Sequence, residues 1–242
     1  MATLVKSYQD EYTGGKFIAK TFLYMFLALL LTTVVSLGLG ALFTYLLLGP
    51  DRSVSETSYN IFLGLMIGSA VLVLIMTFWI QLSLLRGKHS IAVPFIIYAT
   101  AMGVLLSSFT LYLPFYTLAL GVGLTSLIFG LMALIGFLGG DRIRAFGMIG
   151  IGLLFGAIIL SLFSALIYFF NWGVGYYINI IVSAIMFLAM LFITAFDIYR
   201  IKKIAESGMG SKNLALYCAF SLYVDFIYIL IRILSLLARN KS

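Results

Sequence analysis

Charged residues are scarce in this chain: Asp, Glu, Lys and Arg together make up 10% of its 242 residues, whereas soluble domains carry about a quarter. Apolar residues make up 63%, which is more than a soluble core of this size buries, so part of the surface must face lipid. No linker, low-complexity run or charge block divides the chain. The composition therefore predicts one all-α membrane domain.

Metal-binding and catalytic side chains are equally scarce. Cys218 is the only cysteine and His89 the only histidine, which excludes an internal disulfide, a multi-cysteine metal site and a three-histidine zinc site. His89 stands between Lys88 and Ser90 in a basic loop, where a hydrolase base deep in the membrane is not expected. No GxxxxGK phosphate-binding loop occurs. We therefore expect neither an enzyme nor a bound cofactor.

Seven apolar runs are long enough to cross a bilayer, which takes about 20 residues. They cover residues 20–48, 60–85, 91–112, 115–138, 145–170, 174–200 and 213–237. Pro94 falls in the first turn of the third run, where proline is tolerated. The first run is too long for a signal-peptide core. The sequence thus predicts an N-terminal segment over 1–19 and a seven-helix transmembrane domain over 20–242.

Lys and Arg are divided unequally between the two sides of these spans. Eleven lie on the side of the N-terminus: Lys6, Lys16, Lys20, Arg86, Lys88, Arg142, Arg144, Arg200, Lys202, Lys203 and Lys212. Three lie on the other side: Arg52, Arg239 and Lys241. The excess predicts a cytoplasmic N-terminus in a multi-pass cell-membrane protein, and the net charge of +7 reflects this orientation rather than a nucleic-acid partner. The basic C-terminal tail leaves two options, a seventh crossing or a re-entrant last segment.

Two acidic residues lie deep in the predicted spans. Asp197 is near the cytoplasmic end of 174–200, and Asp225 is near the middle of 213–237. A charged side chain at the bilayer centre costs about 2.5–3.5 kcal/mol on insertion scales, so it faces protein or water and marks a functional site by default. The short connection makes the two spans antiparallel neighbours. The two carboxyls are therefore our candidate site.

Asp225 belongs to a polar stripe with helical spacing. Its members are separated by three, four, three and four residues: Cys218, Ser221, Asp225, Tyr228 and Arg232. Thr194 lies one turn before Asp197 on the same side of its span. We expect Ser221, Tyr228, Arg232 and Thr194 to support the site. Arg232 has two readings, a counter-charge for Asp225 or a side chain that reaches the outer interface.

Residue counts place the two carboxyls at different depths in the membrane, which argues against their contact. Asp197 is six residues from Lys203, while Asp225 is thirteen from Lys212, an offset of about 10 Å at 1.5 Å per residue. If the carboxyls meet, they share a proton as a pH-responsive latch, or bind a cation when both are ionised. Otherwise Asp197 pairs with Arg200 or reaches water, and Asp225 forms a hydrogen bond to a neighbouring helix.

Small residues recur at four-residue spacing, which permits close helix approach but also follows from the abundance of glycine in membrane helices. The pairs are Gly64 and Gly68, Gly136 and Gly140, and Gly152 and Gly156.

Motifs in the C-terminal third are similar to those of a known family. Residues 196–202 read Phe-Asp-Ile-Tyr-Arg-Ile-Lys, and residues 221–227 read Ser-Leu-Tyr-Val-Asp-Phe-Ile. They resemble the Bax inhibitor-1, or transmembrane Bax inhibitor motif, family. Residues 20–26, Lys-Thr-Phe-Leu-Tyr-Met-Phe, and residues 123–126, Gly-Leu-Thr-Ser, resemble its bacterial branch.

The resemblance implies a fold in which the seventh helix is central and surrounded by the other six. It also implies a pH-sensitive calcium leak channel or exchanger, with calcium as the transported ion at paired aspartates that match Asp197 and Asp225. Eukaryotic members suppress cell death, and some bacterial relatives are linked to a membrane-bound quality-control protease. The alternative function is therefore a non-transporting regulator or partner of such a protease.

The chain departs from the family pattern at Gln81. In a bacterial relative, an arginine follows the aromatic pair of the second helix and pairs with the aspartate of the sixth. Here Phe78 and Trp79 are followed by Ile80 and Gln81. A glutamine can form a hydrogen bond but cannot neutralise a carboxylate, so Gln81 is expected to be a weaker helix-two partner.

Overall fold

The computed structural model describes residues 14–47, 56–86, 90–170, 172–208 and 210–239. Every regular element in these ranges is helical: α2 (Gly14–Leu47), α3 (Glu56–Arg86), α4 (Ala92–Tyr112), α5 (Phe115–Leu138), η1 (Gly140–Arg142), α6 (Ile143–Phe170), α7 (Trp172–Glu206) and α8 (Lys212–Arg239). Seven of these described helices are long and apolar enough to cross a membrane, which confirms the predicted all-α class with seven spans. Residues 1–13, Arg52, His89 and Lys241 lie outside the described residues.

The helix ends differ from the predicted spans mainly where charged residues continue a helix. The predicted end at residue 200 is wrong, because α7 runs on to Glu206. Lys202 and Lys203 pair with Glu206 at 3.8 and 3.3 Å, a helical spacing that stabilises this charged last turn. Likewise α2 begins at Gly14, six residues before the predicted boundary.

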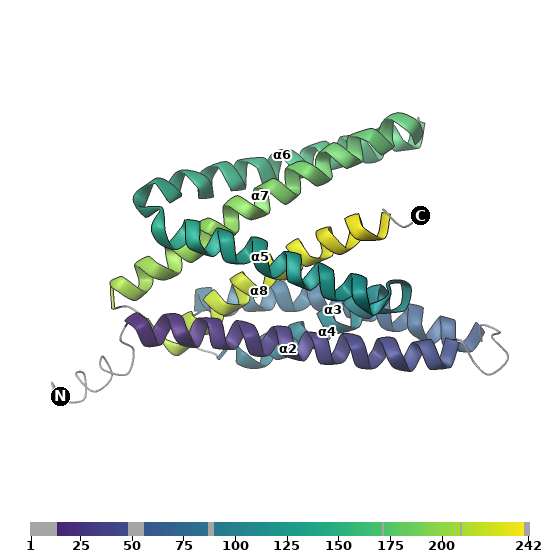
Figure 1. The fold of residues 1–242 in the computed structure, drawn as a ribbon, viewed down its shortest axis with the longest axis horizontal. Helices are drawn as coiled ribbons and strands as arrows, with labels where there is room; N and C mark the ends of the chain where they lie inside the picture. The colour runs from purple at the N-terminus through teal and green to yellow at the C-terminus, as the bar shows by residue number, and fades with distance from the viewer. Residues whose placement is uncertain (1–13, 48–55, 87–89, 171, 209, 240–242) are drawn as a thin grey trace.

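α8 is the most buried of the described helices. In its most apolar stretch, 67% of the residues are buried, against 44% or less in the matching stretches of the other six spanning helices. It packs against α2, α3, α4, α5 and α7, whereas α6 packs mainly against α7 at the edge of the bundle (Figure 1). α8 is therefore largely enclosed, and its encirclement by all six other helices stays a prediction.

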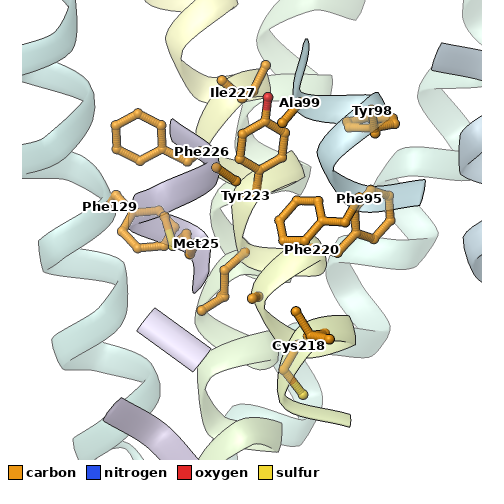
Figure 2. Close-up of a cluster of buried hydrophobic side chains, with 14 of the residues drawn as sticks. Met25, Phe95, Tyr98, Ala99, Phe129, Cys218, Phe220, Tyr223, Phe226 and Ile227 are labelled. Carbon is orange, nitrogen blue, oxygen red and sulfur yellow. The ribbon is translucent and has the colours of Figure 1, made fainter. Parts of the chain in front are cut away.

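Aromatic rings form the core around α8 (Figure 2). Phe95 of α4 meets Phe220 and Tyr223 of α8 edge-on, with ring centroids 5.6 and 5.5 Å apart. The Tyr223 hydroxyl lies 2.6 Å from the Thr32 hydroxyl of α2, which is also 3.0 Å from the carbonyl oxygen of Ala99 in α4. One buried polar contact thus joins α2, α4 and α8 in the centre of the bundle.

The first turn of α2, the η1 turn, the end of α7 and the start of α8 lie at one end of the bundle (Figure 1). Most basic residues of the described chain belong to these segments. The 28-residue α8 ends at the opposite end, at a length of about 42 Å for a helix of this size. α8 therefore crosses the bundle and is long and apolar enough to span a membrane, and the choice between a seventh crossing and a re-entrant last segment stays a prediction.

The glycine spacing gave a poor guide to helix approach. An added Cβ would meet nothing within 4 Å at Gly64, Gly68, Gly152 or Gly156, and Gly140 instead adopts a φ of 60° in the η1 turn. Of the six glycines, only Gly136 sits against another helix, where a Cβ would collide with the carbonyl of Ala195 in α7.

Candidate functional site

Asp197 and Asp225 lie in the interface between the antiparallel helices α7 and α8. Both are nearly inaccessible, with exposed fractions of 5% and 4%. The Ser221 hydroxyl of α8 donates a hydrogen bond to Oδ2 of Asp197, so Asp197 lies level with Ser221. Asp225 follows Ser221 by one turn and interacts with the Thr194 hydroxyl, one turn before Asp197. The register therefore brings the two carboxyls within one helical turn of each other.

The expected depth mismatch shrinks because α7 is longer than predicted. Asp197 lies nine residues before the end of α7 at Glu206, and Asp225 lies thirteen residues after the start of α8 at Lys212. The offset is thus four residues, about 6 Å, and the two carboxyls interact electrostatically across the interface.

Arg200 provides the positive charge of the site. Its Nη2 lies 3.5 Å from Oδ1 of Asp197, a separation typical of an ion pair but long for a hydrogen bond. Pairing with Arg200 and proximity to Asp225 were treated as alternatives for Asp197, and the structure has both. With both carboxyls ionised, two negative charges would share one guanidinium.

Asp225 has an unsatisfied oxygen. Its Oδ2 is buried and has no hydrogen-bond partner among the described residues. Buried polar atoms are normally paired, because an unmade hydrogen bond in a dry site costs about 1–3 kcal/mol. A proton, a water molecule or a cation would satisfy this oxygen.

Comparison with known proteins bears on this pair. The family model described as inhibitor of apoptosis-promoting Bax1 matches residues 14–242. The chain belongs to the Bax inhibitor-1 family. Neither the curated proteins nor the solved structures contain a significant match. In this Bax inhibitor-1 family protein, both aspartates lie within the matched region.

The position of Gln81 differs from its expected role in this family member. Its Oε1 accepts a hydrogen bond of 3.2 Å from the Tyr217 hydroxyl of α8, and the Arg200 guanidinium lies 6.0 Å from the centroid of the Tyr217 ring. Among the described residues, Gln81 is therefore linked to the site through Tyr217 and Arg200. Tyr217 was missed in the sequence, although it stands one turn before Ser221 and next to Cys218.

The C-terminal half of the polar stripe also faces α7. The guanidinium of Arg232 donates to the hydroxyls of Ser183 at 3.1 Å and Tyr228 at 3.1 Å, and lies 5.3 Å from the centroid of the Tyr228 ring. No carboxylate lies within 4 Å of Arg232 among the described residues. Arg232 is thus held by neutral groups two turns beyond Asp225, and Tyr228 stands between them.

The site carries few metal ligands. No group of three or more His, Cys, Asp or Glu side chains occurs within the described ranges. Around Asp197 and Asp225, the hydroxyls of Ser221 and Thr194 are the further oxygens. A separate cavity of about 490 Å³ between α2, α4, α5 and α8 is lined by apolar and hydroxyl side chains without a charge, so it is no part of this site.

Proposed function

We propose that this protein is a pH-sensitive cation leak channel or exchanger, with calcium as its ion and the Asp197–Asp225 pair as its proton-controlled site. The observation that carries the proposal is a pair of buried carboxyls with one counter-charge, Arg200, and one unsatisfied oxygen on Asp225. Membership of the Bax inhibitor-1 family supports it. In this proposal the basic end of the bundle faces the cytoplasm at the cell membrane.

The proton would decide the charge of the interface. With one shared proton, the pair and Arg200 are neutral together, and the Ser221 hydrogen bond to Asp197 holds α7 against α8. Without that proton, the group carries one net negative charge in a dry interface, which only water or a cation relieves. Proton loss and cation entry are therefore coupled at this interface.

Calcium fits the site as a passing ion. Ca²⁺ takes six to eight oxygen ligands, and this site offers two carboxyls and the hydroxyls of Ser221 and Thr194. A calcium ion would therefore keep part of its water. Incomplete coordination favours release, as passage across a membrane requires.

The test is calcium flux into liposomes that contain the purified protein, measured across a pH series. Asp225→Asn keeps the shape of the side chain but cannot lose a proton, so it should flatten the pH dependence. Glu206→Gln makes the matching change at an exposed carboxylate and should leave it intact. An unaltered pH dependence in Asp225→Asn would refute the proposal.

The closed packing of the site also fits the alternative function, a regulator that transports nothing. Both carboxyls are buried and enclosed by α7 and α8. This alternative predicts no calcium flux at any pH, together with co-purification of a membrane-bound quality-control protease. Flux that Asp225→Asn alters would exclude it.

A further inference from the structure

A groove of about 430 Å³ opens between α6 and α7 at the basic end of the bundle. It is separate from the interface that holds the aspartates, because it lies on the α6 side of α7. Its lining combines three cations with apolar and aromatic side chains: Arg144, Met148, Phe196, Tyr199, Arg200 and Lys203.

The lining is ordered along the helices. On α7, Lys203, Arg200 and Phe196 follow one another at steps of three and four residues from the charged end inwards. On α6, Arg144 lies in the first turn and Met148 one turn deeper. The cations therefore lie at the membrane boundary, and the apolar side chains extend into the span. Met148 is 72% exposed, so this part of the groove is open to lipid.

Some N–H donors of these cations have no hydrogen-bond partner among the described residues. Asp141 is 3.8 Å from both Arg144 Nη2 and Lys203 Nζ, beyond hydrogen-bond distance. Arg144 Nε donates to the Tyr199 hydroxyl at 3.2 Å. The two outer nitrogens of its guanidinium stay available to an anion. Arg200 Nε is buried without a hydrogen-bond partner among the described residues.

The nearby carboxylates do not cancel this charge. Asp141 contacts Lys203 and Arg144, and Glu206 contacts Lys203 at 3.3 Å. Glu206 is shared with Lys202 at 3.8 Å, and Arg200 pairs with Asp197 on the α8 side of α7. Arg144, Arg200, Lys202 and Lys203 therefore face three carboxylates, Asp141, Glu206 and Asp197. One positive charge remains at the mouth of the groove.

We propose that this groove binds an anionic phospholipid of the surrounding bilayer. The phosphate would lie among Arg144, Arg200 and Lys203, since guanidinium groups bind phosphate through paired N–H donors, and an acyl chain would follow Met148 and Phe196. The apolar half of the groove selects a lipid over free phosphate.

Binding there would reach the aspartate pair through Arg200. The same guanidinium lines the groove and lies 3.5 Å from Asp197. A phosphate bound to Arg200 weakens the attraction between Arg200 and Asp197. Anionic lipid thus regulates the proposed cation site from the opposite face of α7, a consequence that rests on the proposed function.

The binding test uses spin-labelled phosphatidylglycerol in phosphatidylcholine vesicles that contain the full chain. The fraction of label immobilised by the protein should exceed that of spin-labelled phosphatidylcholine. Arg144→Gln with Lys203→Gln should weaken this preference roughly tenfold, since each basic residue near a membrane surface contributes a several-fold attraction. Arg144→Lys with Lys203→Arg keeps both charges and should retain most of it.

A matched control separates the groove from the general charge of this end. Lys16→Gln with Lys212→Gln removes two charges from the same end but outside the groove, and should preserve the preference. An equal loss in the control pair would overturn the proposal. Displacement of the labelled lipid by millimolar inorganic phosphate would also overturn it, because the site would then be one for a free anion.

The regulatory arm compares calcium flux in anionic and neutral vesicles. Wild type should differ between the two, and the Arg144→Gln, Lys203→Gln pair should not. Lipid preference without any flux would contradict the proposed function alone. Flux that Asp225→Asn alters, with no lipid preference in wild type, would overturn the lipid site alone.

Discussion

Replacing Thr32 by valine should destabilise the protein more than replacing Tyr223 by phenylalanine, although both changes break the same hydrogen bond. The two hydroxyls are 2.6 Å apart in the centre of the bundle, and both side chains are almost fully buried. The Thr32 hydroxyl also lies 2.9 Å from the carbonyl oxygen of Ala28 and 3.0 Å from that of Ala99. The difference lies in what each change leaves behind.

The magnitudes follow from these partners. Tyr223→Phe leaves the Thr32 hydroxyl with two carbonyl acceptors, so the loss is that of one neutral hydrogen bond, about 0.6–1 kcal/mol. Thr32→Val leaves the Tyr223 hydroxyl buried without its partner and removes the contact with Ala99. An unsatisfied buried hydroxyl raises the loss to about 1–3 kcal/mol.

The assay is a double-mutant cycle on the free energy of unfolding of the protein in mixed micelles. The double variant should be less destabilised than the sum of the single variants, with a coupling of about 0.6–1.7 kcal/mol. Thr33→Val is the matched control, because the Thr33 hydroxyl is exposed and donates only to Leu29 of its own helix. It should change the free energy of unfolding by less than about 0.5 kcal/mol.

Two results would refute this reasoning. The first is a loss in Tyr223→Phe as large as that in Thr32→Val. The second is a coupling near zero, which would mean that the hydroxyl contact does not hold α8 to α2 in the folded protein.

Two further predictions concern the α5–α7 contact and the site charge. Gly136→Ala should lower the free energy of unfolding by about 1–3 kcal/mol, since its Cβ would meet the Ala195 carbonyl. Gly130→Ala is the control, because a Cβ there meets nothing within 4 Å, and it should be neutral or stabilise the protein by up to about 1 kcal/mol. A loss in Gly130→Ala equal to that in Gly136→Ala would contradict the close contact. Arg200→Gln should move the midpoint of any pH-dependent flux upward by about one pH unit, the small end of the range for a partly exposed partner, because the carboxyl pair loses its guanidinium. A downward shift in the flux series would exclude Arg200 as the counter-charge.

Much of the architecture could be read from local sequence. The seven spans were predictable because crossing a bilayer needs a long apolar run with its backbone hydrogen bonds closed within the helix. The bounds of α5 agree with the predicted 115–138. The polar stripe of α8 was visible as a three-and-four spacing, and it faces α7 through Ser221 and Arg232.

The neighbours of Asp197 could be named but not ranked. Arg200 and Thr194 were within reach of Asp197 by helical spacing, and Ser221 belonged to the polar stripe of the next helix. The choice among them depends on how far α7 is rotated and shifted along α8, a quantity that periodicity within one helix does not contain. Its extension to Glu206 supplied the shift that reduced the offset of the two carboxyls to one turn.

The sequence by itself determined that this chain has seven helices able to cross a membrane and two acids within them, because the cost of exposing apolar surface to water and of burying charge in lipid acts on each segment alone. The tertiary structure decided which groups meet those acids. The hydrogen bond from Ser221 to Asp197, the contact of Gln81 with Tyr217 and the close approach at Gly136 each join two different helices. Such contacts depend on the packing of whole helices, which no local pattern encodes.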